Sequence, residues 1–395
     1  MTGREYWMWM AGIPWLYYEK IKKLIGIFGS VEKIYHVDEK ELAVRAGWNP
    51  EEIKGLNDSK QSFDPKKYLK MLREKKIGFV CVEDENYPEK LRLYGHKPYF
   101  LFYKGKLPDK NIPAVALVGA RACSGYGRNM ARNLGRELSE RGVQVISGMA
   151  RGIDTYSGIG ALEGNTPAFA VAGCGADICY PSENIELYDN ILKTGGIISE
   201  YPPGSPPVSW HFPQRNRIIS GLADKVVVVE AKEKSGSLIT VEWALEQGKD
   251  IMAVPGRAGD RLSSGCNRLI KTGAGMVTCA KDILEELEYH AWNHGDKKMN
   301  QEKILEKDFL LLYSELGLQP KNIYELMEAT GLEYERLMEM LLHLQLRGVI
   351  EQSSDNYYSR RDVCLEKGDV YGKVSCDCGI TGKGKDNQEI FGEKL

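Results

Sequence analysis

The stretch AVALVGARACSGYGRNMARNLGRELSERGVQVI, residues 114–146, contains the repeating unit that decides the fold. It begins with an apolar run at 114–118, passes through a glycine-rich turn into a helix-like segment at 126–141, and ends in a second apolar run at 143–146. Short uninterrupted apolar runs are typical of strands buried on both faces of a parallel sheet. The stretch therefore predicts a strand, a helix and a parallel strand.

The same alternation extends over residues 76–290. Further apolar runs lie at Phe79–Val82, Tyr99–Tyr103, Ala168–Ala172, Gly196–Ile198, Lys225–Glu230, Ile251–Val254 and Gly275–Thr278. Helix-like segments between them lie at Asp154–Leu162, Glu186–Lys193 and Leu238–Gln247. Alternating strands and helices are typical of a doubly wound α/β domain, and we predict one here.

Smaller units flank this core. Short helix-like segments lie at Glu19–Phe28, Glu39–Ala46 and Pro65–Lys75, and they predict a small helical domain over 1–75. Further helix-like segments lie at Leu305–Leu316, Asn322–Thr330 and Tyr334–Leu346, followed by a hairpin turn at Ser353–Asn356. Three helices and a hairpin predict a winged-helix domain over 304–362. We expect a linker at 291–303 and a disordered tail at 363–395.

Composition and charge exclude several classes of protein for this chain. The chain has 395 residues, is 43% hydrophobic, and carries a net charge of −2, which excludes a uniformly basic nucleic-acid coat. The charge is uneven, because residues 119–151 hold six Arg against two Glu, whereas 304–362 hold 6 Lys and Arg against 11 Asp and Glu. Nine cysteines without a CxxC pair, and no apolar run that could span a bilayer, predict a reduced, cytoplasmic protein without a metal site.

Candidate phosphate-binding residues lie where predicted strands end, since ligands of doubly wound sheets bind there, near helix N-termini. The residues are Gly119, Arg121 and Ser124 after the first strand quoted above, and Gly148, Arg151 and Gly152 after the second. Neither turn is a GxGxxG or Walker A sequence, so a purely structural strand-to-helix turn is the alternative. Asp154 is either a functional acid or the N-cap of the next helix.

A third candidate segment is Phe212-Pro-Gln-Arg-Asn-Arg217. It places Arg215 and Arg217 around Asn216, and guanidinium groups suit phosphates and base edges better than ammonium groups do. The alternative is an ion pair that ties the segment to Glu200 or Glu230.

A fourth segment, Lys234-Ser235-Gly236-Ser237, opens a predicted helix. It combines backbone amides, hydroxyls and a cation, and it predicts a second anion-binding cradle. The sequence contains no GxSxG motif and no histidines in a metal-binding spacing. We therefore predict no catalytic residue, no metal and no cofactor, and we expect His211 to be a surface or packing residue.

In this order, these segments resemble the DNA-processing protein A family (DprA), also called Smf. The resemblance covers about 79–290 and rests on VALVGARACSGYG, SGMARGIDTYSGIGAL, ISEYPPGSPP, FPQRNRIISGLADKVVVVEA, KSGSLITVEWALEQGKDIMAVPG and SSGCNRLIKTGA. It implies an extended Rossmann-like core that binds single-stranded DNA, usually as a homodimer. It also implies protection of incoming DNA and loading of a RecA-type recombinase in natural transformation, the competence-dependent form of DNA recombination, without catalysis.

The resemblance assigns residues to the DNA-facing loops and reveals departures. The assigned residues are Gly119, Arg121, Ser124, Gly148, Arg151, Arg217 and Lys234–Ser237. Gly158 and Ile159 replace a common His-Arg pair, and Gln214 replaces a common Arg. In the helix–hairpin–helix-like N-terminal region, Trp15-Leu16-Tyr17 replaces the expected Gly-x-Gly turn, which weakens a DNA role there. The acidic winged-helix region favours a protein contact over a phosphate contact.

Two other hypotheses remain. Ser237-Leu-Ile-Thr-Val-Glu242 loosely resembles a loop of nucleotide phosphoribohydrolases, so that Glu242 would face a ribose and Arg121 a monophosphate. The third hypothesis is an assembly scaffold whose pocket is vestigial. Release of base from AMP or CMP would support the enzyme, and failure to bind either DNA or mononucleotides would support the scaffold.

Overall fold

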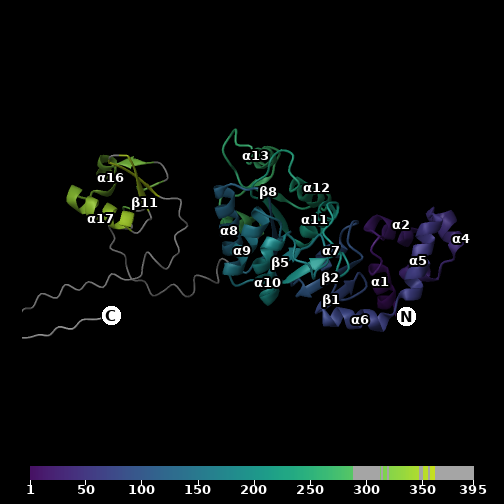
Figure 1. The fold of residues 1–395 in the computed structure, drawn as a ribbon. Helices are drawn as coiled ribbons and strands as arrows, with labels where there is room; N and C mark the ends of the chain where they lie inside the picture. The colour runs from purple at the N-terminus through teal and green to yellow at the C-terminus, as the bar shows by residue number, and fades with distance from the viewer. Residues whose placement is uncertain (288–311, 313–314, 318–319, 347–349, 355, 361–395) are drawn as a thin grey trace, which may run out of the picture. The chain divides into compact units, whose positions relative to one another are not determined.

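The structure is a computed structural model that describes residues 1–287, 312, 315–317, 320–346, 350–354 and 356–360 (Figure 1). The chain divides into two compact units, Met1–Gly295 and Asp296–Leu395. The predicted linker at 291–303, the predicted tail at 363–395 and most of the predicted helix at 305–316 lie outside the described residues. Within the described ranges, no helix combines the length and the apolar character needed to cross a membrane.

The first unit is built around one nine-stranded sheet, in the order β1-β2-β6-β5-β4-β3-β7-β8-β9. Its strands are β1 (Ile77–Cys81), β2 (Phe100–Gly105), β3 (Ala114–Val118), β4 (Gln144–Ser147), β5 (Ala168–Val171), β6 (Gly196–Ser199), β7 (Lys225–Val228), β8 (Ile251–Ala253) and β9 (Gly275–Met276). The stretch β6-β5-β4-β3-β7-β8-β9 of this order is parallel throughout. Strand β2 is antiparallel to both of its neighbours, β1 and β6. Each apolar run predicted as a strand is therefore a strand of this sheet.

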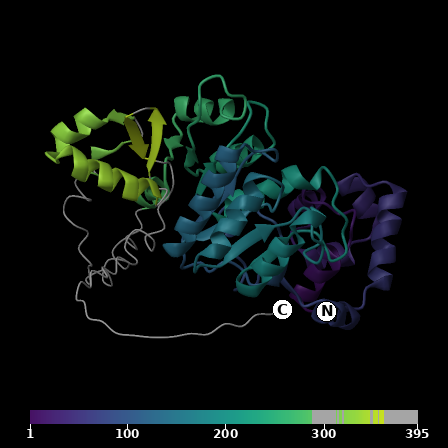
Figure 2. The same ribbon diagram turned by 60° about the vertical axis from the view of Figure 1, so that its left-hand side comes forward.

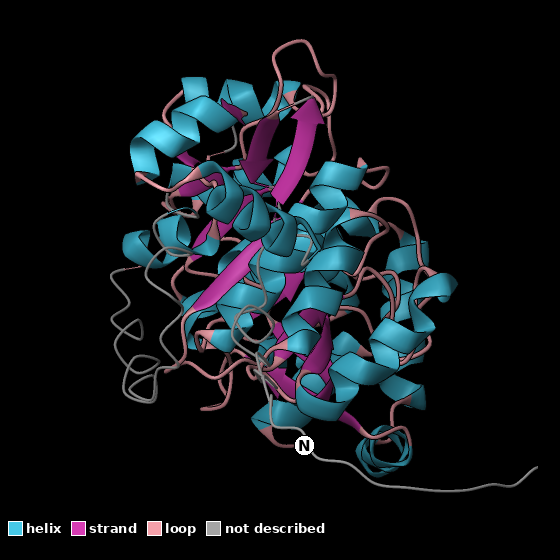
Figure 3. Ribbon diagram, turned by 90° about the vertical axis from the view of Figure 1, so that its left-hand side faces the viewer, coloured by secondary structure: helices cyan, strands magenta, loops and turns pink. Residues whose placement is uncertain are grey.

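Helices cover both faces of the sheet (Figure 3). One layer contains α8 (Gly125–Glu140), α9 (Ile153–Glu163), α10 (Ile185–Thr194), which follows the short 3₁₀ turn η2 (Ser182–Asn184), and α14 (Ala280–Glu286). The other contains α7 (Glu89–Arg92), α11 (His211–Leu222), α12 (Leu238–Glu246) and α13 (Ser264–Lys271). In β3, Val115 and Leu117 face the first layer, and Ala114 and Ala116 face the second. Burial on both faces explains why the strands are continuous apolar runs.

The N-terminal helices pack against the β1–β2 edge and share an apolar core with those strands. They lie at one end of the unit in both views (purple in Figures 1 and 2). They are α1 (Gly3–Ala11), α2 (Tyr18–Phe28), α3 (Val31–His36), α4 (Glu39–Glu41), the π-helical turn η1 (Leu42–Ala46), α5 (Pro50–Ser62) and α6 (Pro65–Glu74). Sequence analysis did not predict α1, because residues 6–11 are buried all round and lack the polar face of an amphipathic helix.

The order of connections creates a topological switch point between β3 and β7. From β3 the chain winds through β4, β5 and β6 on one side, and from β7 it winds through β8 and β9 on the other. Diverging connections leave a crevice beyond the carboxyl ends of the two strands. The segment with Arg215 and Arg217, expected among the DNA-facing loops, forms α11 beside this crevice.

The second unit, in its described part, contains two helices and a small antiparallel sheet. Its elements are β10 (Lys321–Asn322), α16 (Ile323–Thr330), α17 (Tyr334–Leu346), β11 (Ile350–Ser354) and β12 (Tyr357–Arg360). The sheet order is β10-β12-β11. Leu326, Leu337, Leu341 and Ile350 form its buried apolar core, so both described helices and the hairpin lie where the sequence predicted them.

Candidate nucleic-acid interface

A pocket of about 370 Å³ lies at the switch point. Its wall is formed by the turn after β3, the first turns of α11, and the loop that leads from β7 into α12. Arg121, Lys232 and Lys234 line this pocket and are exposed. None of these three cations forms an ion pair with a described residue. We call this site the cation pocket, because its free positive charge suits an anionic ligand.

Two glycines allow the turn after β3 to approach the start of α9. Gly152 has a φ of +75°, and a Cβ atom there would lie 2.2 Å from the carbonyl oxygen of Ala120. A Cβ atom on Gly119 would lie 2.6 Å from the side chain of Ile153. The backbone N–H of Ile153 donates to the Ala120 oxygen at 3.2 Å. Both predicted site glycines therefore have a packing role, and Gly119 in addition lines the pocket.

The N-terminus of α8 is occupied by a carboxylate of the protein itself. Glu230 is 2% exposed, and it accepts hydrogen bonds from the backbone N–H of Ser124 at 2.8 Å and from the Ser124 hydroxyl. The same hydroxyl caps α8 by accepting from the N–H of Gly127 at 3.0 Å. In dinucleotide-binding sheets this helix end holds a pyrophosphate. Here Glu230 occupies this position, so Ser124 bonds to Glu230 and caps α8, and it is not part of the wall of the cation pocket.

Asp154 and Arg215 form the buried base of the cation pocket. Asp154 accepts a hydrogen bond from the N–H of Gly148 at 2.9 Å, and Arg215 donates to the Gly148 carbonyl at 2.9 Å. Burial raises the pKa of Asp154 to about 6, although Arg215 and the Gly148 N–H both lower it. Burial also lowers the pKa of Arg215. Gly148 has no space for a side chain, because a Cβ atom would lie 2.6 Å from the Arg215 guanidinium.

Arg217 lies outside the cation pocket, contrary to its assignment to the DNA-facing loops. Residues two apart on a helix point in nearly opposite directions, so Arg217 faces away from Arg215. It is 1% exposed, and its Nη2 donates to both carboxylate oxygens of Glu200 at 2.7 Å. Its guanidinium also lies 4.6 Å from the ring centroid of Tyr18. The ion pair that the sequence left as an alternative is therefore the observed arrangement.

Arg151 is likewise engaged elsewhere. Its guanidinium donates to both carboxylate oxygens of Glu183, with one N–O distance of 2.8 Å. Both side chains are more than half exposed, and Arg151 is not part of the wall of the cation pocket. The sequence could not show this pair, because Glu183 follows 32 residues later.

The predicted cradle at the start of α12 does line the cation pocket. Lys234, Ser235, Gly236 and Ser237 face it, together with Asn216 of α11. The amide of Asn216 donates to the Gly236 carbonyl at 3.4 Å, which connects α11 to this loop.

The pocket-lining residues that sequence analysis did not name as binding residues include Lys232 and Phe212. Lys232 could have been found, because it follows the same strand as Lys234. The guanidinium of Arg121 lies 5.8 Å from the ring centroid of Phe212. This cation–π contact joins two loops that are far apart in sequence.

The carboxylate of the enzyme hypothesis lies outside the cation pocket, and His211 is buried. Glu242 is exposed on α12 and is not part of the pocket wall. His211 is 5% exposed, its Nδ1 lies 3.0 Å from the Gly173 carbonyl oxygen, and its ring stacks on Tyr201. Burial lowers the pKa of His211, as expected for a packing residue. In the portion of the chain with described coordinates, no group of three acidic, histidine or cysteine residues could hold a metal ion.

Comparisons with known proteins agree with this fold and arrangement. The family described as DNA recombination-mediator protein A matches residues 78–288. The DNA processing protein DprA of Streptococcus pneumoniae is 45% identical over 214 residues, which are 54% of this chain and 76% of that protein. Protein Smf of Escherichia coli is 32% identical over 370 residues, which are 92% of this chain and 98% of that protein.

A solved structure gives the same result. The X-ray structure of DprA from Streptococcus pneumoniae superposes with a TM-score of 0.63 at 36% sequence identity. The match covers 73% of this chain and 99% of that chain. The large, mostly parallel sheet with helices on both faces is therefore shared with a Rossmann-like DprA structure. The family resemblance read from the loop sequences is confirmed, and the chain belongs to the DNA recombination-mediator protein A family.

Proposed function

We propose that this protein binds single-stranded DNA in the cation pocket and acts as a recombination mediator. The observation that carries the proposal is the convergence of Arg121, Lys232 and Lys234 on one pocket. All three are exposed, and none has a carboxylate partner among the described residues. The hydroxyls of Ser235 and Ser237 add donors at the start of α12. Together they suit the phosphates of a DNA backbone.

The other predicted site residues have different roles in this proposal. Gly148, Gly152 and Ser124 shape the loops, Arg215 supplies positive charge beneath the pocket, and Arg217 and Arg151 make no phosphate contact. Asn216 is the residue of α11 placed to meet a base edge.

The enzyme hypothesis has less support. A phosphoribohydrolase needs a carboxylate at the ribose, whereas Glu242 is not part of the pocket wall and Glu230 is buried against Ser124. The carboxylate that does line the pocket, Asp154, is 7% exposed and accepts backbone hydrogen bonds. A test for base released from AMP and CMP separates the two hypotheses.

The defining experiment is a titration of labelled oligo-dT by fluorescence anisotropy at several salt concentrations, with a matched duplex as control. We expect the single strand to bind more tightly than the duplex. Arg121→Ala and Lys234→Ala should each weaken oligo-dT binding about 10- to 100-fold, because each loses a charged hydrogen bond. Each should also reduce the slope of log affinity against log salt by about 0.7.

Arg151→Ala is the matched control. It removes an exposed guanidinium from a neighbouring loop, but one that is paired with Glu183 outside the pocket. We expect its affinity and salt slope to equal those of the wild type. Equal losses in Arg151→Ala and Arg121→Ala would mean that binding depends on general surface charge, and the assignment of the pocket would fail.

The wider role rests on the family. We propose a homodimer that protects incoming single strands and loads a RecA-type recombinase on them in natural transformation. In this proposal, residues 1–75 form a helical domain, 76–290 the DNA-binding core, and 304–362 a winged helix that contacts protein. A recombinase-loading assay on oligonucleotides coated with single-strand-binding protein tests the mediator role. No acceleration by the wild-type protein would contradict it.

A further inference from the structure

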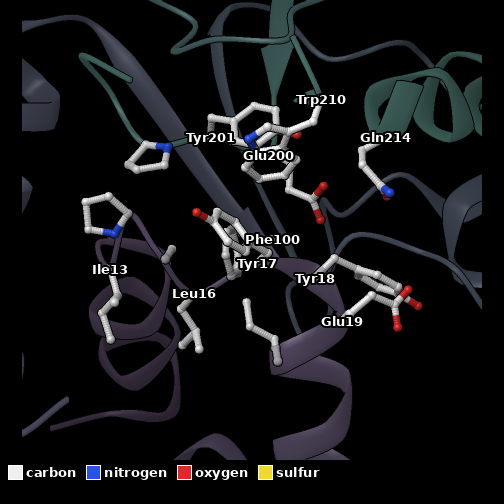
Figure 4. A pocket seen from close by; sticks show the side chains of 14 residues that line it. Ile13, Leu16, Tyr17, Tyr18, Glu19, Phe100, Glu200, Tyr201, Trp210 and Gln214 are labelled. Carbon is white, nitrogen blue, oxygen red and sulfur yellow. The ribbon is translucent and has the colours of Figure 1, made fainter. Parts of the chain in front are cut away.

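A second pocket, of about 220 Å³, lies between the N-terminal helices and the core of the first unit. Residues from Ala11 to Ile21 form one side, and β2, the segment after β6 and the start of α11 form the other. Five aromatic side chains line it: Tyr17, Tyr18, Phe100, Tyr201 and Trp210 (Figure 4). We call it the aromatic pocket.

The mouth of the aromatic pocket exposes two large rings. Tyr17 is 42% exposed and Trp210 is 39% exposed. They contact each other edge to face with ring centroids 4.4 Å apart. Behind them, Phe100 is 4% and Tyr18 is 8% exposed, so the exposed rings rest on a buried aromatic base. Exposed rings held in place by such packing are typical of binding surfaces.

The aromatic pocket adjoins the cation pocket through the first turns of α11. Trp210 and Gln214 line the aromatic pocket, whereas Phe212, Pro213 and Arg215 line the cation pocket. One helical turn spans about 5.4 Å. A DNA strand whose phosphates contact the cation pocket therefore has a neighbouring base within reach of Trp210.

The charge at the aromatic pocket favours an uncharged base over a phosphate as the ligand. Glu200 is neutralised by Arg217, whereas the carboxylate of Glu19 is exposed at the rim. An anion at the rim disfavours a second phosphate but not an uncharged ring. The amide of Gln214 offers a donor and an acceptor to a base edge (Figure 4).

We propose that the aromatic pocket binds one nucleobase of the strand held in the cation pocket, by stacking on the ring of Trp210 and packing edge to face against Tyr17, whose ring lies at 80° to that of Trp210. The inference rests on the proposed single-strand binding and extends it. It gives the N-terminal helices a part in DNA binding that does not need the Gly-x-Gly turn, since Tyr17 belongs to the sequence that replaces that turn. Stacking tolerates every base, because each base has a π-face.

The test compares two ligands of equal length, oligo-dT and an abasic oligomer that keeps the sugar–phosphate backbone. Trp210→Ala and Tyr17→Ala should each weaken oligo-dT binding by about 5- to 150-fold. Neither should change the affinity for the abasic oligomer or the salt slope. Trp210→Phe keeps a stacking ring and should retain most of the affinity. Leu93→Ala, which removes a 76% exposed apolar side chain, is the control and should match the wild type.

Each outcome separates the inference from the proposed function. If the wild type binds neither oligomer, the single-strand function fails. If the wild type binds oligo-dT and both alanine variants bind it equally well, the aromatic pocket does not hold a base. Equal losses on oligo-dT and on the abasic oligomer would indicate a structural effect and would also overturn the inference. A variant that binds both oligomers normally but loses recombinase loading would overturn the inference as well. In that case the aromatic rings and Glu19 would bind a cationic side chain of a protein instead of a base.

Discussion

The ion pair between Arg217 and Glu200 gives a prediction about stability that also tests the assignment of the DNA site. The Arg217 side chain is 1% exposed and the Glu200 side chain is 11% exposed, with N–O distances of 2.7 Å. Removing one partner leaves the other charge buried and unpaired. Arg217→Met and Glu200→Met should therefore each lower the free energy of unfolding by about 3–5 kcal/mol.

The double variant Arg217→Met/Glu200→Met should be much less destabilised than the sum of the two single variants. It removes both desolvated charges, and a methionine at position 217 keeps an apolar contact with the ring of Tyr18. The Nε and Nη1 atoms of Arg217 have no hydrogen-bond partner within the described residues, so their loss costs no hydrogen bond. We expect a coupling energy of at least about 2 kcal/mol between the two positions.

Urea unfolding followed by circular dichroism measures these values, with the slope m compared among the variants. Oligo-dT anisotropy is measured on the same samples under conditions where each variant is folded. We expect the double variant to retain DNA affinity, unlike Arg121→Ala. Additive losses of stability would refute the buried pair, and a loss of affinity equal to that of Arg121→Ala would restore Arg217 to the DNA site.

Two further predictions concern the loops around the cation pocket. Gly152→Ala should lower the free energy of unfolding by at least about 3 kcal/mol, since it combines a positive φ with a Cβ atom 2.2 Å from the Ala120 oxygen; an unchanged urea midpoint would contradict this. Burial raises the pKa of Asp154 from 3.8 to about 6, so between these values the folded state binds more protons than the unfolded state, and stability falls as pH rises. Asp154→Asn cannot titrate, so its stability deficit relative to the wild type should shrink by about 2 kcal/mol from about pH 4 to pH 7. A deficit that is constant over this range would contradict the shift.

Much of the fold could be predicted from local sequence. The core strands are continuous apolar runs because both faces of the sheet are covered, and that pattern is visible without the structure. The turns after β3 and β7 could also be placed at one edge of the sheet, because the carboxyl ends of parallel strands lie at the same edge. Arg121 and Lys234 were each expected in an anion-binding loop, and the structure places both at the cation pocket.

Tertiary structure decided which partner each charged side chain contacts. Arg215 and Arg217 are two residues apart and look equivalent in sequence, yet α11 turns one under the cation pocket and the other toward Glu200 and Tyr18. Glu230 gives no local sign that it fills the N-terminus of α8, since Ser124 lies 106 residues away. The aromatic pocket likewise exists only because residues 11–21 pack against α11.

The sequence by itself determined the α/β class, the family and the loops that carry the candidate site, because apolar periodicity and glycine-rich turns are local properties of the chain. Only the tertiary structure decided which cations remain free for a ligand. An ion pair depends on a partner brought close through space, and burial sets its strength. For that reason Arg121, Lys232 and Lys234 line the cation pocket without an ion pair to any described residue, whereas Arg151 and Arg217 are held by Glu183 and Glu200.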